Sequence, residues 1–223
     1  MAQPGPLFGD CFRLILLTDD PVLAAEADRA CVTRIGIDIE RRGKAERQAG
    51  HNTRLSQHDW PHLEAIAPVL RSARAFVRIN SIHDGSSAEV ETALSCGAQS
   101  IMLPFFHTAE EVAHFVRLVR GRAEVMVLIE TAAALIRIRE VLAVQGIDEP
   151  MIGLNDLRLT LGVANHFEVL ASPLLDAACA ELRRTGRPFS MGGVARASDG
   201  TSEEISSRHV DSREVFMDGI GSS

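Results

Sequence analysis

Residues 124–162 read EVMVLIETAAALIRIREVLAVQGIDEPMIGLNDLRLTLG, and this stretch decides the fold. An apolar run covers Glu124–Glu130, apolar residues at helical spacing follow as far as Gly146, and a second apolar run covers Met151–Leu154. Near-continuous apolar runs are typical of strands that are covered on both faces of a parallel sheet. The stretch therefore predicts a strand–helix–strand unit with two parallel strands.

The same alternation extends along the chain on both sides of this unit. The predicted strands are Arg13–Thr18, Arg34–Glu40, Ala75–Asn80, Ser100–Pro104, Glu124–Glu130, Met151–Leu154, Pro188–Gly193 and Arg213–Met217. Helical patterns separate them, including one that opens at Thr108 with a glutamate three residues later, as in a capping box, and one that ends at Gly97. The pattern predicts one α/β domain over residues 1–223, a (β/α)8 TIM barrel. The sequence leaves no room for a helix after Met217, so the last helix is expected to be absent.

A doubly wound sheet is the alternative architecture, but no GxGxxG motif follows the first predicted strand. With 223 residues, 46% of them hydrophobic, the chain can form a sizeable core. The formal net charge of -7 argues against a nucleic-acid-binding surface. Apolar runs are too short to span a bilayer and no signal peptide is visible, so we expect a cytoplasmic protein. Its isolated cysteines, expected to be reduced thiols, are Cys11, Cys31, Cys96 and Cys179.

Polar residues gather where the predicted strands end. Active sites of (β/α)8 barrels lie at the carboxyl ends of the strands, so these residues are expected to converge on one rim. They are Asp38, Glu40, Arg78, Asn80, Glu130, Asn155, Asp156, Gly192 and Gly193. Gly192 and Gly193 open the stretch GGVARASDG, which could bind phosphate through its backbone or simply form a tight turn.

Glu130 and Asp156 follow neighbouring predicted strands. Two carboxylates, completed by water and substrate, suit Mg²⁺ or Mn²⁺, which prefer oxygen ligands. The alternative is that each carboxylate caps the helix that follows it. Arg78 suits a two-bond contact with a substrate carboxylate. The alternative for this residue is an internal ion pair with Asp38 or Glu40, and such a pair could also orient the arginine.

The longest irregular stretch, RRGKAERQAGHNTRLSQHDWPHL at residues 41–63, is expected to lie over the carboxyl-end rim. Its histidines, His51, His58 and His62, could bind zinc or transfer protons. The segment HDWPHL is also typical of a helix start, with Asp59 near the cap.

Four segments in this order resemble the HpcH/HpaI aldolase and citrate lyase beta-subunit family: VRIN, ALSCGAQSIMLPFFHTAEEV, VLIETAAAL and GIDEPMIGLNDLRLTLG. The resemblance covers roughly residues 75–163, and IGIDIE is a looser match upstream. It implies a (β/α)8 barrel of the phosphoenolpyruvate/pyruvate-binding superfamily. It also implies that the protein cleaves or forms carbon–carbon bonds next to a pyruvate- or acetyl-derived enolate, with Mg²⁺ or Mn²⁺.

The resemblance places metal ligands at Glu130 and Asp156, and places at Arg78 the group that holds the keto-acid carboxylate or enolate oxygen. The acidic end of the family's second strand falls on Asp38 and Glu40. Arg41 stands where aldolases of the family have a histidine and citrate-lyase-like members an aspartate. His51, His58 or a water molecule at the metal are the alternatives for the missing base. Leu154 and Asn155 stand where aldolases have small residues or proline.

The expected function is therefore a divalent-metal-dependent carbon–carbon lyase that acts on a small 2-oxo or hydroxy acid through an enolate. Arg78, Asp38, Glu40 and His51 are expected to act in catalysis, and Arg78, Asn80, Asn155 and Gly193 to contact substrate. The alternatives are an isomerase or hydrolase of the same superfamily, or a binding subunit without activity. A homo-oligomer is expected, with no nucleic-acid or membrane partner.

Overall fold

The computed structural model describes residues 13–44 and 57–193. In these residues, parallel strands form one seven-stranded sheet in which each strand is hydrogen-bonded to the next along the chain. The strands are β1 (Ile15–Leu17), β2 (Arg34–Asp38), β3 (Arg74–Arg78), β4 (Ser100–Leu103), β5 (Glu124–Ile129), β6 (Glu149–Gly153) and β7 (Ser190–Gly192). The sequential order excludes the doubly wound alternative, whose strand order reverses.

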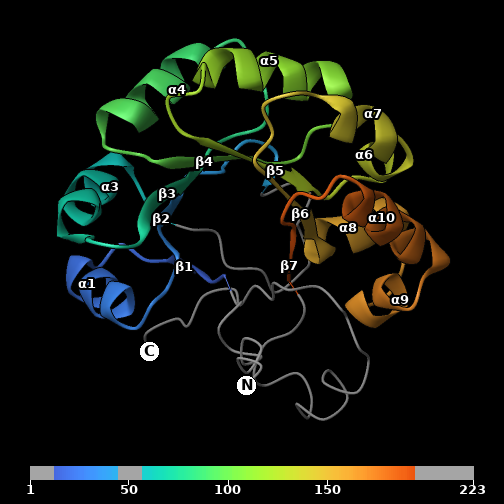
Figure 1. The fold of residues 1–223 in the computed structure, drawn as a ribbon, viewed down its shortest axis with the longest axis horizontal. Helices are drawn as coiled ribbons and strands as arrows, with labels where there is room; N and C mark the ends of the chain where they lie inside the picture. The colour runs from blue at the N-terminus through green and yellow to red at the C-terminus, as the bar shows by residue number, and fades with distance from the viewer. Residues whose placement is uncertain (1–12, 45–56, 194–223) are drawn as a thin grey trace, which may run out of the picture.

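The sheet curls into an arc, and the helices cover its convex face (Figure 1). The helices are α1 (Pro21–Arg29), α3 (Trp60–Ile66), the 3-10 helix η2 (Ala67–Val69), α4 (Ser86–Ser95), α5 (Ala109–Val119), α6 (Ala132–Ile136), α7 (Ile138–Ala143), α8 (Leu154–Leu161), α9 (His166–Leu170) and α10 (Pro173–Arg184). The described part of the chain is thus a curled, seven-stranded parallel α/β fold of the TIM-barrel kind. The predicted eighth strand, Arg213–Met217, lies outside the described residues. Within the described ranges, no helix combines the length and the apolar character that crossing a bilayer requires.

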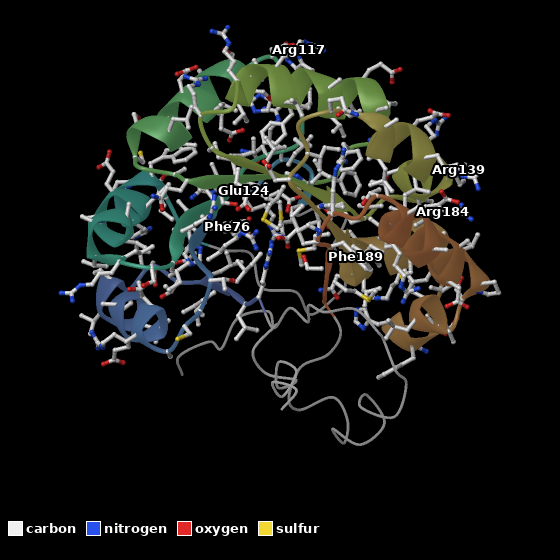
Figure 2. All side chains as sticks on the ribbon, viewed as in Figure 1. Phe76, Arg117, Glu124, Arg139, Arg184 and Phe189 are labelled. Atoms are coloured by element: carbon white, nitrogen blue, oxygen red, sulfur yellow. The ribbon has the colours of Figure 1, made fainter. Side chains whose placement is uncertain are left out.

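Both faces of the sheet are apolar, which explains the near-continuous apolar runs of the sequence. Along β5, Val125 and Val127 pack outward against the helices, whereas Met126 and Leu128 belong to an inner cluster on the concave face. Phe76 of β3 is part of the same inner cluster. Figure 2 shows that sulfur-bearing side chains gather inside the arc. Because side chains alternate along a strand, burying both faces requires apolar residues at successive positions.

The first residues of several strands form a buried polar network at the amino end of the sheet. Arg34 of β2 donates two hydrogen bonds to Glu124 of β5, both at 2.9 Å, and a third to Glu149 of β6 at 2.5 Å. Ser190 of β7 donates to the other oxygen of Glu149 at 2.9 Å. Four steps across a flat sheet would separate β2 from β6 by about 19 Å. Their contact therefore shows that the sheet curls strongly enough to bring its two halves together.

Several local predictions are confirmed. Thr108 and Glu111 form a reciprocal capping box at the start of α5. Asp59 caps α3, and His62 completes the capping box. This confirms the interpretation of HDWPHL as the start of a helix.

Most strand ends differ from the prediction by one or two residues, and two further differences concern the helices. The helix predicted after Glu130 divides at Arg137 into α6 and α7, although the Arg137 amide still donates to the Ala133 carbonyl at 3.2 Å. Strand β6 ends at Gly153, and Leu154 already belongs to α8. An apolar residue fits both a buried strand and a buried helix, so the pattern did not separate them.

Candidate active site

Three acidic side chains meet at the carboxyl ends of the strands. Glu40 follows β2, Glu130 follows β5 directly, and Asp156 lies in the first turn of α8, immediately after β6. One oxygen from each residue lies within 4.8 Å of the other two. All three side chains are buried, with exposures between 2% and 4%. Among the described residues, these three acids form the group of potential metal ligands that lie close enough together to hold one ion. The group contains no histidine.

Neither Glu130 nor Asp156 is the N-cap residue of a helix, so the alternative that each carboxylate caps the following helix is wrong. Thr131 caps α6, and its hydroxyl accepts a hydrogen bond from the Ala134 amide at 3.0 Å. Helix α8 starts after Gly153 with no side-chain cap. The two carboxylates therefore stand beside each other for a reason other than capping.

The backbone around Glu130 makes room for its carboxylate. A Cβ atom on Gly153 would lie 2.9 Å from both Cβ and Oε2 of Glu130, closer than such atoms approach in proteins. Glu130 Oε1 accepts a hydrogen bond from the Phe105 amide at 2.9 Å. Phe105 has a φ of 47°, a left-handed conformation that is uncommon for a bulky residue and that concentrates at functional sites.

Arg78, at the end of β3, forms the internal ion pair that was one of its two interpretations. Its Nε donates to Asp38 Oδ1 at 2.9 Å and its Nη2 donates to Asp38 Oδ2 at 2.6 Å. Arg78 Nε also lies 3.6 Å from Glu40 Oε2. The arginine side chain remains 19% exposed, so a small anion can still reach it. Its contact with substrate stays a prediction.

Lys44 completes this cluster, although sequence reasoning did not single it out. Its Nζ lies 2.8 Å from Asp38 Oδ2 and 3.3 Å from Glu40 Oε2. The spacing of four residues between Glu40 and Lys44 was the available signal, but the same spacing is common on exposed helices. Sequence reasoning also placed Glu40 at this rim without making it a candidate third metal ligand.

The electrostatics of the cluster differ between its two sides. Burial raises the pKa of Asp38, but the charges and hydrogen bonds of Arg78 and Lys44 outweigh it and hold that pKa well below its usual range. On the other side, burial and the negative charges of Glu40 and Asp156 raise the pKa of Glu130 well above its usual value, while Arg78 opposes this rise. At Glu130, burial and the repulsion of the neighbouring acids therefore outweigh the attraction of Arg78.

The donor set fits Mg²⁺ or Mn²⁺. Four carboxylates (Asp38, Glu40, Glu130 and Asp156) gather beside two cationic side chains, Arg78 and Lys44. A divalent cation would offset the repulsion that Glu40 and Asp156 exert on Glu130. All the candidate ligand atoms are carboxylate oxygens, the type that these hard cations prefer.

The structure uses the predicted substrate-binding asparagines in other hydrogen bonds. Asn80 Oδ1 accepts from the Arg41 and Arg42 amides at 2.8 and 3.0 Å, and its Nδ2 donates to Glu89 at 2.5 Å, so it fastens the segment after β2. Asn155 Oδ1 lies 2.5 Å from His166 Nε2. Their roles toward substrate stay predictions.

Of the two remaining predicted residues, Gly193 is described by the structure and His51 is not. Gly193 adjoins Asn155, because a Cβ atom on this glycine would lie 2.8 Å from Asn155 Nδ2. His51 lies outside the described residues, as does the rest of residues 45–56.

His58 lies beside the cluster but is held by the backbone. Its Nδ1 accepts the Asp38 amide hydrogen at 3.1 Å, and its carbonyl accepts a hydrogen bond from Arg41 Nη2 at 2.6 Å. Burial lowers the pKa of His58, so the neutral imidazole is favoured. His62 is occupied by the capping box of α3. The hypothesis of a zinc site at these two histidines finds no support among the residues that the structure places.

A cavity of about 510 Å³ adjoins the cluster. The loops after β2, β3 and β4 line it, with Arg42, His83, Phe105 and His107 among the lining residues. Phe105 connects the two features, because its amide binds Glu130 while the residue borders the cavity. The arrangement is thus a buried acidic cluster with an adjoining space of the size that small-molecule ligands occupy.

Several solved structures share this fold. The citrate synthase SbnG matches with a TM-score of 0.70 and 15% identity, over 94% of this chain and 86% of that chain. An HpcH/HpaI aldolase/citrate lyase family protein from Burkholderia cenocepacia J2315 matches with a TM-score of 0.68 and 18% identity, over 92% and 86%. The protein CitE from Mycobacterium tuberculosis, solved in complex with magnesium and acetate, matches with a TM-score of 0.65 and 21% identity, over 92% and 84%. At these identities the likeness concerns the fold.

No curated protein sequence matches this chain closely enough to count as a relative. The family model of HpcH/HpaI aldolase/citrate lyase matches residues 35–205, which include β2 from its second residue, the strands β3 to β7 and all the residues of the acidic cluster. The chain belongs to the HpcH/HpaI aldolase/citrate lyase family.

Proposed function

We propose that this protein is a divalent-metal-dependent carbon–carbon lyase that acts on a small 2-oxo or hydroxy acid. The observation that carries the proposal is the buried group of Glu40, Glu130 and Asp156 beside Arg78. Gathering three carboxylates in a buried site is costly because like charges repel one another, and a divalent cation would offset that repulsion. Citrate synthase SbnG and macrophomate synthase share the fold, which supports a carbon–carbon reaction as the class.

Each residue of the cluster has a distinct proposed role. Glu40, Glu130 and Asp156 would hold Mg²⁺ or Mn²⁺, which, when bound, supplies Lewis-acid stabilisation of negative charge on a substrate oxygen. Arg78 binds the substrate carboxylate or enolate oxygen through its exposed edge. Asp38 orients Arg78 through its two hydrogen bonds. His51 moves the proton between the substrate hydroxyl and solvent.

The substrate contacts extend beyond the acidic cluster. Asn80, Asn155 and Gly193 shape the substrate side of the rim, and the adjoining cavity receives the part of the substrate that leaves as the second product. We further propose that the enzyme works as a cytoplasmic homo-oligomer, with the eighth strand of the (β/α)8 barrel supplied by residues 213–217.

Calorimetric titration with MgCl2 and MnCl2 tests the cation site. Wild type is expected to bind one divalent cation per chain, and Glu130→Gln and Asp156→Asn are each expected to weaken binding at least tenfold. Glu91→Gln is the control, because Glu91 is exposed and pairs with Arg122, which is not part of the cluster. Unchanged affinity in both site variants would contradict the proposed site.

The reaction class needs a second experiment. Oxalate, a mimic of the pyruvate enolate, is expected to raise the melting temperature of wild type only when Mg²⁺ is present, and Arg78→Met is expected to abolish this shift. A panel of 4-hydroxy-2-oxo acids is then assayed for released pyruvate, with the metal-free protein as control. Metal-dependent oxalate binding without any bond cleavage would favour the binding-subunit alternative.

A further inference from the structure

Lys44 is the only lysine in this chain, since the other residues among its 23 Lys and Arg are arginines. It is also buried, with 5% exposure, whereas lysine side chains are almost never buried unless they are paired. Its partners are Asp38 and Glu40, at 2.8 and 3.3 Å. The single lysine ammonium group of the chain thus lies inside the acidic cluster of the candidate active site.

The contacts of Lys44 connect the two sides of that cluster. Asp38 Oδ2 accepts from both Lys44 Nζ and Arg78 Nη2, which ties the lysine to the arginine side. Glu40 Oε2 lies near Lys44 Nζ and also belongs to a residue of the candidate cation site. An ammonium group is a compact point charge that can serve carboxylates of two different residues in a small space. A guanidinium group pairs best with a single carboxylate, as Arg78 does with Asp38.

We propose that Lys44 is a positioning residue that sets the charge of the site so that a divalent cation and an anionic oxo-acid can bind together. The ammonium group of Lys44 lowers the negative charge that an anionic substrate meets beside the bound cation. Without Lys44, the site carries one more negative charge, so it binds the cation more strongly and repels the substrate more strongly. The proposal rests on the proposed function, because it assigns Lys44 a role at the same site.

The two ligands provide a test in which the expected changes have opposite signs. Lys44→Met removes the charge and keeps an unbranched side chain of similar length. In calorimetry, it is expected to bind Mg²⁺ at least about tenfold more tightly than wild type, because a nearby positive charge has been removed. With saturating Mg²⁺, it is expected to bind oxalate about tenfold more weakly. A purely structural role would loosen the site and weaken both ligands.

Two further variants separate charge from other effects. Lys44→Arg keeps the charge and is expected to bind Mg²⁺ within about threefold of wild type. Arg139→Met also removes one positive charge, but its side chain is 76% exposed and pairs with Glu181, so both affinities are expected to stay within about twofold. Melting temperatures of all variants report whether each protein is folded under the conditions of the titration.

Three outcomes would overturn the proposal. The first is weaker or unchanged Mg²⁺ binding by Lys44→Met in a folded protein. The second is a Lys44→Arg variant that behaves like Lys44→Met. The third is a mass increase on Lys44 after treatment of wild type with pyruvate and borohydride, which would show that the lysine reacts covalently. The titration of wild type tests the proposed function by itself. If wild type does not bind Mg²⁺, both the cation site and the role of Lys44 are refuted. If wild type binds Mg²⁺ and only Lys44→Met departs from expectation, the result tests the role of Lys44 alone.

Discussion

The guanidinium of Arg78 and the carboxylate of Asp38 form two parallel hydrogen bonds, 2.9 Å and 2.6 Å long. The two residues end neighbouring strands, and their Cα atoms are partners in the register of β2 and β3. The pair is therefore built into the sheet rather than onto a loop. It holds the arginine that the proposed function needs at the rim, next to the acidic cluster.

Asp38→Asn is expected to destabilise the protein by about 3 kcal/mol at pH 7, because it removes the buried carboxylate that makes the shortest ion pairs with Arg78 and Lys44. The pKa of Asp38 lies below its usual range in the folded protein, so the stabilisation is present above the unfolded value near 4 and is lost as the pH falls further. Urea unfolding at pH 7 and pH 3 measures the effect. The difference between wild type and variant should shrink at pH 3; an equal difference at both pH values would contradict the ion-pair explanation.

Glu130→Gln is expected to raise the melting temperature of the metal-free protein while removing its response to Mg²⁺. Burial and the charges of Glu40 and Asp156 raise the pKa of Glu130, so the folded protein loses stability as the pH rises above the unfolded value near 4.3. The variant lacks this ionisation, and its advantage should therefore be greater at pH 8 than at pH 5. Melting scans in EDTA and in Mg²⁺ measure both effects. A metal-free variant that melts below wild type at pH 8 would be evidence against the repulsion.

Gly153→Ala is expected to weaken Mg²⁺ binding about tenfold and to cost about 1–3 kcal/mol of stability, because the added methyl group would press on the Glu130 side chain. Gly85→Ala is the control: its φ of -88° is close to the -98° of Gly153, and a methyl group there would meet only the His83 ring. Calorimetry and urea unfolding of both variants separate the two positions. Equal loss of cation affinity in both would exclude the steric explanation.

Arg34→Met is expected to destabilise the protein by about 3 kcal/mol or more, since it removes the cationic partner of Glu124 and leaves the buried Glu149 with only the half-exposed Arg13. Arg122→Met is the matched control, because Arg122 also makes two hydrogen bonds to one glutamate, Glu91, but at the surface. It is expected to cause no measurable change. Urea unfolding of the two variants measures the difference, and similar losses would show that the buried network does not link the halves of the sheet.

Much of the fold was predictable because it is encoded locally. The apolar runs of residues 124–162 give β5 and β6 with errors of one or two residues, and the capping residues Thr108 and Asp59 start the expected helices. The division of the helix at Arg137 was not predictable, since the periodicity on either side of it is continuous.

The candidate site was predictable in part. Parallel strands all end at the same edge of the sheet, so the polar residues that follow them gather at one rim. Glu130, Asp156 and Glu40 lie together there for this reason. That Thr131 caps α6 in place of Glu130 was not visible, because both residues stand where a cap could form.

The sequence by itself determined the alternation of strands and helices, the residues at the strand ends and the family of the protein. Only the tertiary structure decided that Arg78 is paired with Asp38, that Asn80 is used to fasten the segment after β2, and that Lys44 lies among the acids. The physical reason is the distance along the chain over which each effect acts. Backbone preferences and apolar periodicity act within one element, whereas the charge and burial of a side chain depend on groups that the curled sheet brings together from distant parts of the chain.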